Sequence, residues 1–303
     1  MRNATIRQLQ IFSVAASHLS FARAAEKLHL THAAISLQIK QLEEVSGTLL
    51  FERIGKRVFL TEAGEILLSH TRQILQSLKE ADEALLALKG LKGGRIAVAV
   101  ASTAEYFAPG LLAEFRKTQA DVRIRMLIDN RDTVSRLLAG NEVDLAIMGR
   151  PPAELDAVAV AFAPHPLVII ASSAHPLSRL PNIAVEDLAD EMLIVRESGS
   201  GTRSAMEEFF LERSVKPRIG MEMGSNEAIK QAVVAGLGIS FISQHTLGLE
   251  LKAERLSILR VEGTPVMRRW HIVRHKSKHL TPALAAFWDF MVEVAPTQLR
   301  KLV

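Results

Sequence analysis

Residues 20–45 read SFARAAEKLHLTHAAISLQIKQLEEV, two short amphipathic segments with a break between them. Thr31 offers a hydroxyl N-cap to the second segment. Each segment carries apolar side chains at helical spacing on one face, namely Phe21, Ala24, Ala25, Leu28, Ile35, Ile39 and Leu42. The pattern predicts a helix-turn-helix whose second helix, from Thr31 to Glu44, enters the major groove of DNA. A helical hairpin inside a protein core is the alternative reading.

The next segment favours DNA binding. Residues 51–61 read FERIGKRVFLT, with a basic tip from Arg53 to Arg57 between apolar flanks. This predicts a small β-wing whose base packs on the helices and whose tip reaches phosphates. Residues 1–60 contain eight Lys or Arg and four Asp or Glu, so the whole net charge of +4 lies there. Contact with nucleic-acid phosphates requires such a basic region.

Length and composition narrow the class of protein. A chain of 303 residues predicts about two domains. No stretch approaches the roughly 18 continuous apolar residues of a membrane span, and the N-terminal residues lack the apolar core of a secretory signal. With no cysteine, disulfides and thiolate metal sites are excluded. We therefore expect a cytoplasmic protein that does not associate with a membrane.

Residues 61–89 contain no proline and only one glycine, Gly64, which predicts one long helix. Its apolar positions step by seven, four, three, four and three residues, at Leu67, Ile74, Leu78, Ala81, Leu85 and Leu88. Only Thr71 interrupts this heptad pattern, which is typical of a coiled-coil seam and predicts dimerisation. A long helix packed on its own domain is the alternative.

Beyond Gly94, short apolar strands alternate with helices, which predicts an α/β fold with a mainly parallel sheet covered on both faces. We expect a DNA-binding domain at 1–60, a linker helix at 61–90 and a ligand-binding domain at 91–303. Within the last, residues 91–165 and 267–303 form one lobe and residues 166–266 the other.

Ligands of such sheets bind beyond the carboxyl ends of strands. Four places qualify, and three of them put free backbone N–H groups at a helix N-terminus, which suits an anion. Arg150 and Arg203 can add bidentate contacts. The predicted ligand-binding residues are Ser102, Thr103, Arg150, Ser200, Thr202, Arg203, Asn226 and Glu227. Taken singly, each place also fits an ordinary capped helix.

No catalytic set stands out, and no metal-binding pattern does either. The ten histidines are scattered, and Ser200 and Ser225 lack the context of a nucleophile elbow. We expect His165, between two prolines, to lie in a hinge or turn, with ligand contact as the alternative. Residues 274–279, RHKSKH, are predicted to form a solvated loop rather than a second nucleic-acid site.

The residues at fixed spacing in segment 5–66 resemble the winged helix-turn-helix of LysR-type transcriptional regulators. The matching residues are Leu9, Phe12, Ser20, Phe21, Ala24, Ala25, Leu28, Ala34, Ile35, Ser36, Gln38, Ile39, Leu42, Glu43, Leu50, Phe51, Arg53, Leu60, Thr61, Glu62, Ala63 and Gly64. The later layout resembles the family's effector domain, two α/β lobes joined by crossing strands, similar to a periplasmic binding protein.

This resemblance implies a regulator that binds double-stranded DNA at an interrupted palindrome, as a homodimer or homotetramer, and recruits RNA polymerase. His32 and Ser36 would read bases, while the basic side chains would hold phosphates. The predicted DNA-binding residues are Thr31, His32, Ala33, Ser36, Lys40, Arg53, Lys56 and Arg57. Two departures from the family leave the base preference open. The family commonly has Gln followed by Pro or Ala where this chain has His32 and Ala33. It often has a polar residue where this chain has Leu37, and Leu37 either contacts a thymine methyl group or simply packs.

Further phrases resemble the RuBisCO-operon regulators within this family. They are YFAP at 106–109, DLAIMGRPP at 144–152, FAPHPL at 162–167, RESGSGTR at 196–203 and GMEMGSNEAIKQAV at 220–233. The resemblance implies an activator of carbon-fixation genes that responds to a small anionic effector, a phosphorylated metabolite or NADPH, and has no resident cofactor. Lys230 would add to the positive charge near such an effector.

Three alternatives stay open. The chain could be a LysR-type regulator of another operon with a different anionic effector. It could be a solute-binding protein or enzyme with the same two lobes. It could also be an architectural DNA-binding protein whose lobes no longer bind a ligand.

Overall fold

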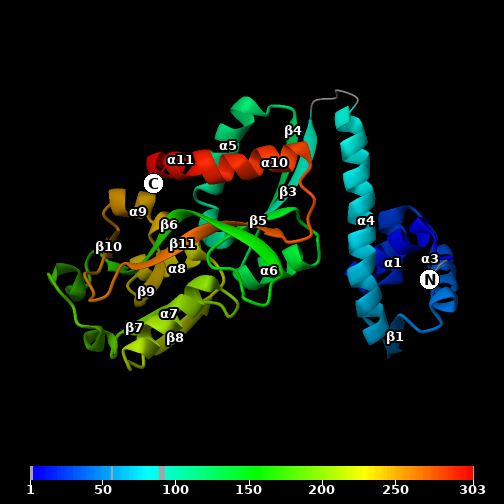
Figure 1. Cartoon of the computed structure of the whole chain (residues 1–303). Helices are drawn as coiled ribbons and strands as arrows, with labels where there is room; N and C mark the ends of the chain where they lie inside the picture. The colour runs from blue at the N-terminus through cyan, green and yellow to red at the C-terminus, as the bar shows by residue number, and fades with distance from the viewer. Residues whose placement is uncertain (1–2, 56, 89–92, 303) are drawn as a thin grey trace. The chain divides into compact units, whose positions relative to one another are not determined.

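The computed structural model describes residues 3–55, 57–88 and 93–302. Contacts within the chain divide it into two compact units, Met1–Gly90 and Leu91–Val303. The first unit holds a helical cluster, a hairpin and a long helix, and the second holds an α/β sheet (Figure 1).

The first unit is a winged helix-turn-helix, as the sequence predicts. Its elements are α1 (Ile6–His18), α2 (Phe21–Leu28), α3 (His32–Ser46), β1 (Phe51–Ile54), β2 (Arg57–Leu60) and α4 (Glu62–Leu88). The side chains of Thr5, Ser20 and Thr31 accept N–H groups at the starts of the first three helices. Because a cap satisfies otherwise unpaired donors, these three residues define where the helices begin.

The start of α4 is joined closely to the wing. The Thr61 hydroxyl donates to the Leu49 carbonyl at 2.7 Å and accepts the Gly64 N–H at 3.0 Å. A Cβ atom at Gly64 would lie 2.1 Å from the Leu50 carbonyl oxygen. Only glycine therefore permits the helix to pass this close to the strand that begins the wing.

Along α4 the apolar row is divided between two roles. Thr71, which interrupts the heptad, is fully buried within the first unit, and Leu68 is buried beside it. Ile74, Leu78 and Leu85 are 42%, 39% and 58% exposed. The side chain of Leu88 lies outside the described residues. The row from Ile74 to Leu85 therefore does not serve the core of its own unit.

Within residues 93–302, nine strands form one mixed sheet in the order β4-β3-β5-β11-β6-β9-β7-β8, with β10 paired to β6. The strands are β3 (Gly94–Ala101), β4 (Val122–Asp129), β5 (Leu145–Met148), β6 (Ala157–Ser172), β7 (Met192–Arg196), β8 (Arg218–Met223), β9 (Ile239–Ser243), β10 (Leu256–Ile258) and β11 (Val266–His275). β3 is parallel to β4 and β5, and β7 is parallel to β8 and β9. The antiparallel pair β6 and β11 joins these two parallel groups.

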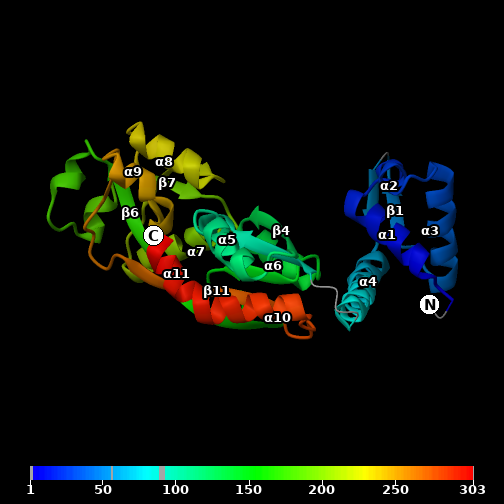
Figure 2. The ribbon, with the colours of Figure 1, turned by 90° about the horizontal axis from the view of Figure 1, so that it is seen from above.

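Helices cover both faces of each group. The α-helices are α5 (Ala108–Thr118), α6 (Arg131–Ala139), α7 (Gly201–Glu212), α8 (Asn226–Val234), α9 (Gly248–Lys252), α10 (Pro282–Asp289) and α11 (Ala295–Leu302). The single turns are η1 (Ser102–Ala104), η2 (Pro176–Arg179), η3 (Val185–Leu188), η4 (Gln244–Thr246) and the π-helical η5 (Phe290–Val294). Within the second unit, α5 and α6 lie with one lobe and α8 and α9 with the other (Figure 2).

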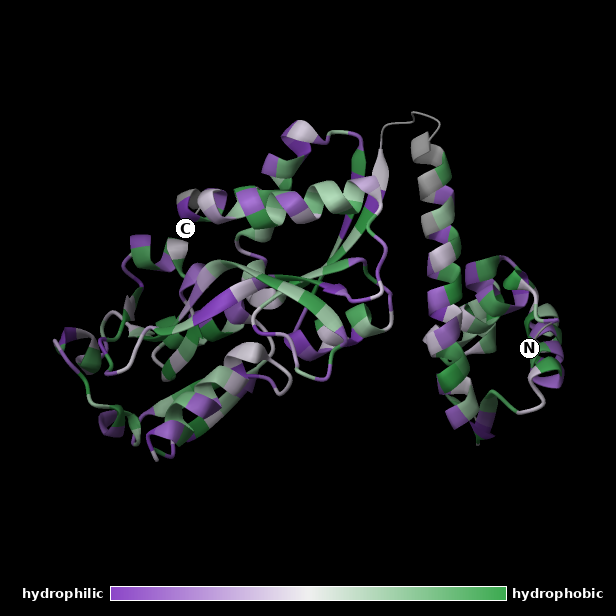
Figure 3. Cartoon of the chain, viewed as in Figure 1, coloured by the Kyte–Doolittle hydropathy of each residue, from purple (hydrophilic) through white to green (hydrophobic). Residues whose placement is uncertain are grey.

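The helices cover the central strands because β5, β7 and β9 are apolar and buried on both sides. The strands through the middle of the second unit are largely hydrophobic, while the helices alternate hydrophobic and hydrophilic residues (Figure 3). In one lobe the core packs α5, α6 and α10 against β3 and β5. In the other, α7 packs in one core cluster and α8 in a second. The predicted α/β fold with two lobes and crossing strands is confirmed. The prediction of a mainly parallel sheet is wrong, because β6 and β11 pair antiparallel with each other and with their neighbours.

The turn predicted at His165 is wrong, because β6 runs without a break from Ala157 to Ser172. A hinge in this strand, which joins the two lobes, stays a prediction. Pro164 and Pro166 pair with Arg269 and Met267 of β11, whereas β9 begins to pair with β6 only at Leu167. A proline lacks a backbone N–H and is tolerated where one side of a strand has no partner. The two prolines therefore occupy a part of β6 that is paired on one side.

The solvated loop predicted at residues 274–279 is also partly wrong. Lys278 is buried and forms a 2.7 Å ion pair with Asp144, which is buried as well. Arg274 turns back to the carbonyl oxygens of residues 275, 276 and 278. This segment is thus a folded connection into α10. Among the described helices, none has the length and apolar character needed to cross a membrane.

Candidate functional site

Helix α3 presents one exposed face opposite its buried one. Ile35, Ile39 and Leu42 are buried in the core of the first unit. The exposed positions on the other side follow one another by four, three and four residues, at Ala33, Leu37, Lys40 and Glu44. His32 is exposed at the start of the helix, and Ser36 is half-buried beside the exposed row. Thr31 accepts the Ala34 N–H at 3.1 Å and so acts as the N-cap.

One buried ring connects α3 with the wing. The Phe21 ring lies 6.2 Å from the His32 ring and 5.2 Å from the Phe51 ring, and the Arg53 guanidinium lies 5.6 Å from its centroid. Glu43 adds a polar link, because its Oε1 accepts the N–H groups of Leu50 and Phe51. The sequence identified Phe21 only as a core residue and did not predict that it supports both predicted DNA-contacting elements.

The wing is the hairpin of β1 and β2, with Arg53 opposite Val58. Arg53 and Arg57 are exposed, as contact with phosphates requires. Lys56 lies outside the described residues. The DNA-contacting roles of all these side chains stay predictions.

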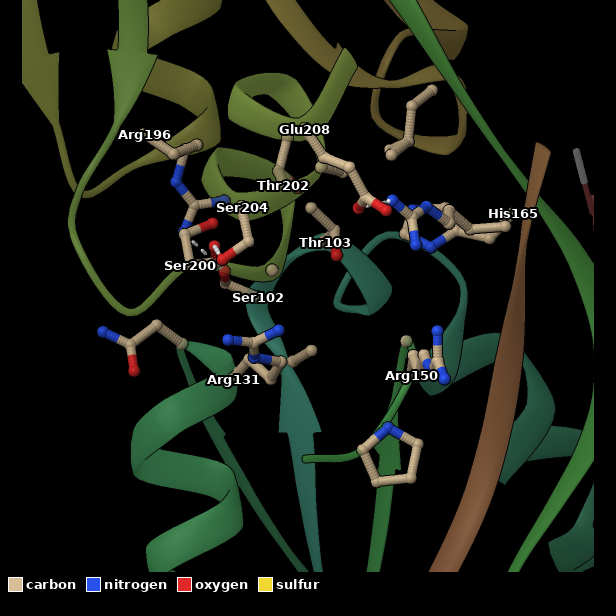
Figure 4. Close-up of a pocket in the computed structure, with 18 residues that line it drawn as sticks. Ser102, Thr103, Arg131, Arg150, His165, Arg196, Ser200, Thr202, Ser204 and Glu208 are labelled. Carbon is tan, nitrogen blue, oxygen red and sulfur yellow. Dashed lines mark hydrogen bonds and ion pairs between the residues drawn. The ribbon is translucent and has the colours of Figure 1, made fainter. Parts of the chain in front are cut away.

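The second unit contains a cavity of about 190 Å³ between its lobes. Five of the eight predicted ligand-binding residues line it: Ser102, Thr103, Arg150, Ser200 and Thr202. They come from the ends of β3, β5 and the start of α7, so residues distant in sequence gather at one opening (Figure 4). Thr103, Ser200 and Thr202 are buried polar side chains. Their hydroxyl groups can donate hydrogen bonds to the oxygens of an anion.

Four arginines line the same cavity: Arg131, Arg150, Arg196 and Arg268. Arg268 is paired with Glu208, and Arg131 lies 3.4 Å from Asp132. Among the residues that the structure describes, no carboxylate lies within 4 Å of the Arg150 guanidinium, and Arg150 is exposed. Figure 4 draws Arg131 and Arg150 on the same side of the cavity, across from Ser204 and Glu208. Arg150 thus supplies unneutralised positive charge at the cavity.

Arg196 connects the two lobes. Its side chain is 1% exposed and forms two hydrogen bonds with Glu197, at 2.7 and 2.9 Å. Two further hydrogen bonds reach Asn226 Oδ1 at 2.7 Å and Ser102 Oγ at 2.9 Å. A second link runs from the Asp132 N–H to the Gly199 carbonyl at 3.2 Å. The lobes are therefore held together at the strand ends that surround the cavity.

Gly199 permits the second of these links. It has a φ of +84°, and a Cβ atom there would lie 3.1 Å from Asp132 Oδ2. A larger residue would both strain the backbone and push the first turn of α6 away. The segment Ser198-Gly199-Ser200-Gly201 therefore makes a contact between the lobes as well as forming the start of α7.

His165 lines the cavity from β6. Its Nε2 lies 3.0 Å from Ser243 Oγ, and its ring stacks on Trp270 with centroids 3.8 Å apart. Burial, His245 and Arg268 hold the pKa of His165 well below its usual value. Burial also lowers the pKa of His245 to about 4, and that ring accepts the Trp270 indole N–H. Both imidazoles are therefore neutral near pH 7.

The other three predicted ligand-binding residues do not line the cavity. Arg203 binds Glu207 and Glu222 and the Arg196 carbonyl. Asn226 accepts from Arg196, and Glu227 forms a 2.8 Å ion pair with Lys230. Lys230 is buried and lies 2.6 Å from Glu250, so its charge is neutralised. These residues support the surroundings of the cavity.

Sequence reasoning missed Arg131, Arg196 and Arg268. The position of Arg131 could have been predicted, because Arg131 begins a helix directly after the end of β4. Ser102 was predicted from the same arrangement after β3. Arg196 is the last residue of the apolar strand β7, and Arg268 lies inside β11, so neither follows the end of a strand, which was the signal used. Their positions in the cavity depend on how the strands pair.

Comparison with known families agrees with this architecture. The LysR substrate binding domain matches residues 89–296, and the bacterial regulatory helix-turn-helix protein, lysR family, matches residues 6–65. The chain belongs to the LysR family. The expectation of a regulator rather than an enzyme is confirmed by this membership.

Within the LysR family, the RuBisCO operon transcriptional regulator of Allochromatium vinosum is 47% identical over 291 residues, which is 96% of each chain. The HTH-type transcriptional regulator CfxR of Cupriavidus necator is 47% identical and covers 97% of this chain and 92% of its own. The resemblance to RuBisCO-operon regulators that the effector-domain phrases suggest is confirmed.

A solved structure of a relative covers the second unit. The CcmR regulatory domain of Synechocystis PCC6803 in complex with 2-PG (2-phosphoglycolate) is 39% identical. It aligns with 67% of this chain and 99% of its own, with a TM-score of 0.64. The regulatory domain of that LysR-type relative therefore binds a small phosphorylated anion.

Proposed function

We propose that this chain is a DNA-binding transcriptional activator of a RuBisCO or carbon-fixation operon, and that a small anionic metabolite controls it. The similarity to two regulators of such operons over nearly the whole chain carries the proposal. A regulator of bacterial promoters acts on the chromosome, so we place it in the cytoplasm. We propose domains at 1–60, 61–90 and 91–303, with one lobe at 91–165 and 267–303 and the other at 166–266.

In the proposed complex, α3 lies in the major groove. Thr31 fixes the start of the helix, Ala33 permits close approach, and His32 and Ser36 read base edges. Lys40, Arg53, Lys56 and Arg57 hold phosphates on either side. The positive charge of residues 1–60 supports the contact of this part of the chain with DNA, since the rest of the chain is neutral overall.

The exposed apolar row of α4 supports pairing of two chains. Ile74, Leu78, Ala81 and Leu85 step by four, three and four residues, the spacing of a two-stranded coiled coil. A two-fold pair reads two half-sites, so the operator is an interrupted palindrome. We propose that effector domains join two such dimers into a tetramer that bends DNA and recruits RNA polymerase.

The effector is proposed to bind between the lobes. The buried hydroxyls of Thr103, Ser200 and Thr202 and the unneutralised Arg150 suit a phosphate or carboxylate. The cavity of about 190 Å³ is smaller than the roughly 300–1,000 Å³ of pockets for drug-sized ligands. Its size favours a compact phosphorylated metabolite over NADPH. The 2-PG complex of the CcmR regulatory domain supports the same class.

Binding between the lobes offers a way to transmit a signal. An anion held by Arg150 from one lobe and by Ser200 and Thr202 from the other stabilises the closed arrangement. A ligand shifts such an equilibrium only by its differential affinity for the two states. In the tetramer, closure of the lobes would change the angle between subunits and so the bend of the DNA.

The test is fluorescence anisotropy on RuBisCO-operon promoter DNA and on an unrelated promoter, at one stated salt concentration. Each titration is run with no metabolite, with 2-phosphoglycolate, with a sugar bisphosphate and with NADPH. We expect selective binding that changes with one of the phosphorylated compounds. Equal weak binding to both DNAs would leave the LysR fold standing and point to another operon.

Two arginine variants sharpen this test. Arg150→Ala should raise the Kd of the effective metabolite by about tenfold or more, because a charge-assisted contact is lost. Arg125→Ala is the matched control, because Arg125 is an exposed arginine on β4 of the same unit that does not line the cavity. Equal effects of the two substitutions would contradict the proposed site.

The rival functions have distinct outcomes. Turnover of any metabolite by the purified chain would favour an enzyme. Failure of every anionic compound to shift the melting temperature would favour an architectural protein with lobes that bind no ligand.

A further inference from the structure

Leu37 is a large apolar side chain on the exposed face of α3, and it is 54% exposed. Leu37 shares the exposed face of α3 with Ala33, which lies one turn earlier, and with Lys40, which lies one turn later. The buried residues Ile35 and Ile39 are on the other side of the helix. The sequence left open whether Leu37 packs or contacts DNA. Within the described residues of the first unit, Leu37 is not part of the core.

The neighbouring side chains determine what this apolar spot can meet. The Lys40 side chain is 73% exposed and lies 3.9 Å from the Glu44 carboxylate. Arg53 and Arg57 are exposed on the wing, so the charge of these neighbouring side chains is positive on balance. A surface with this charge suits a polyanion rather than an apolar protein surface. The helix-turn-helix and the basic wing together identify the polyanion as duplex DNA.

In the major groove, one apolar group distinguishes the base pairs, and that is the C5-methyl of thymine. We propose that Leu37 contacts a thymine C5-methyl and fixes the preference for thymine at one position of each half-site. The inference rests on the proposed function, since it requires α3 to lie in the major groove. It adds a base-reading residue to His32 and Ser36.

The position of Leu37 suits this role. Ala33, four residues earlier, is too small to hold the helix away from the floor of the groove. Leu37 has no hydrogen-bond donor or acceptor, so it gains nothing from the base edges of cytosine or adenine. Burying one methyl group corresponds to about a fourfold change in affinity for one half-site. For a two-fold pair reading two half-sites, the same contact is worth roughly 15-fold.

The experiment uses the full chain and an operator recovered by selection from random duplex DNA, so that it does not depend on which operon is controlled. Each thymine of one half-site is replaced in turn by deoxyuridine, which lacks only the methyl group. Affinities are measured by anisotropy at fixed salt for the unsubstituted chain and for Leu37→Ala, Leu37→Met and Leu211→Ala.

For the unsubstituted chain, one position is expected to lose about fourfold affinity when thymine becomes deoxyuridine. Leu37→Ala should remove that loss, whereas Leu37→Met should keep most of it because the side chain stays apolar and long. Leu211→Ala is the control, since Leu211 is 79% exposed on α7 of the second unit. It should behave like the unsubstituted chain.

Three results would overturn the inference. If Leu37→Ala keeps the same methyl dependence at every position, another residue reads the methyl groups, although α3 still binds DNA. If Leu37→Ala binds every duplex as the unsubstituted chain does, and only its sedimentation coefficient in a parallel ultracentrifugation run differs, Leu37 contacts protein rather than DNA. If no sequence is selected at all, the proposed DNA-binding function fails together with this inference.

Discussion

The ion pair between Lys278 and Asp144 offers a direct test of how the C-terminal segment is attached. Their side chains are 2% and 3% exposed and 2.7 Å apart. Lys278 also donates to Asn141 Oδ1 at 3.1 Å, and Asp144 Oδ2 accepts the Ala97 N–H at 2.7 Å. The pair therefore connects the segment before α10 to the start of β5 and to β3.

Substituting Lys278→Met removes the ammonium group that pairs with the buried Asp144 carboxylate. Breaking a buried pair in this way costs about 3–5 kcal/mol. We expect a value near 3 kcal/mol, because the Ala97 N–H still binds the carboxylate. For a unit of this size, 1 kcal/mol corresponds to about 2–4 °C, so the melting temperature should fall by roughly 6–12 °C.

The assay is calorimetry of the full chain at pH 7.5, following the transition of the second unit. Lys276→Met is the control, because Lys276 is exposed two residues away, and it should change stability by less than about 0.5 kcal/mol. The double variant Asp144→Asn with Lys278→Met removes both charges of the pair, so it should be more stable than Lys278→Met alone. A loss below about 1 kcal/mol for Lys278→Met, or no recovery in the double variant, would refute the reasoning.

Three further predictions concern other parts of the chain. Gly64→Ala should destabilise the first unit by about 1–3 kcal/mol, because the added Cβ atom meets the Leu50 carbonyl oxygen. Gly248→Ala is the control in the same thermal melt, because a Cβ atom there would have no atom within 4 Å. Equal effects of the two substitutions would be inconsistent with the close approach at Gly64. Burial lowers the pKa of His245 to about 4, so the unfolded chain binds a proton more readily, and stability should be full above pH 6.5 and fall toward pH 4. The melting temperature of the second unit at pH 7.5 and pH 5 tests this, and His245→Gln should reduce the difference; an unchanged pH dependence would implicate other groups. Arg57→Ala should weaken binding to all DNA sequences alike and reduce the salt slope by about 1, and selective loss for one sequence would argue against a phosphate contact.

Most of the first unit could be predicted from the sequence. Its helices begin at side-chain caps and bury faces that recur every three or four residues, and both features are contained within one or two turns. The alternation of strands and helices predicted an α/β sheet covered by helices, and the resemblance to the family's effector domain implied its two lobes. The same reasoning placed Ser102, Thr103, Arg150, Ser200 and Thr202 at strand ends, and those five line the cavity.

The failures share one physical cause, which is that local pattern does not record the direction or the partner of a side chain. Pro164 and Pro166 look like a turn, but pairing with β11 keeps β6 extended through them. Arg203 follows a strand as Arg150 does, yet its guanidinium is held by Glu207 and Glu222. Lys278 lies in a basic run and is nevertheless buried by contact with Asp144.

The sequence by itself determined the family, the order of elements and the basic face of the first unit, since these depend on residue types at short, fixed spacings. Only the tertiary structure decided which arginines line the cavity and how the lobes are joined. Arg196 and Ser102, whose hydrogen bond links the lobes, are 94 positions apart. Contacts over such distances depend on strand pairing throughout the sheet, and no local spacing encodes that pairing.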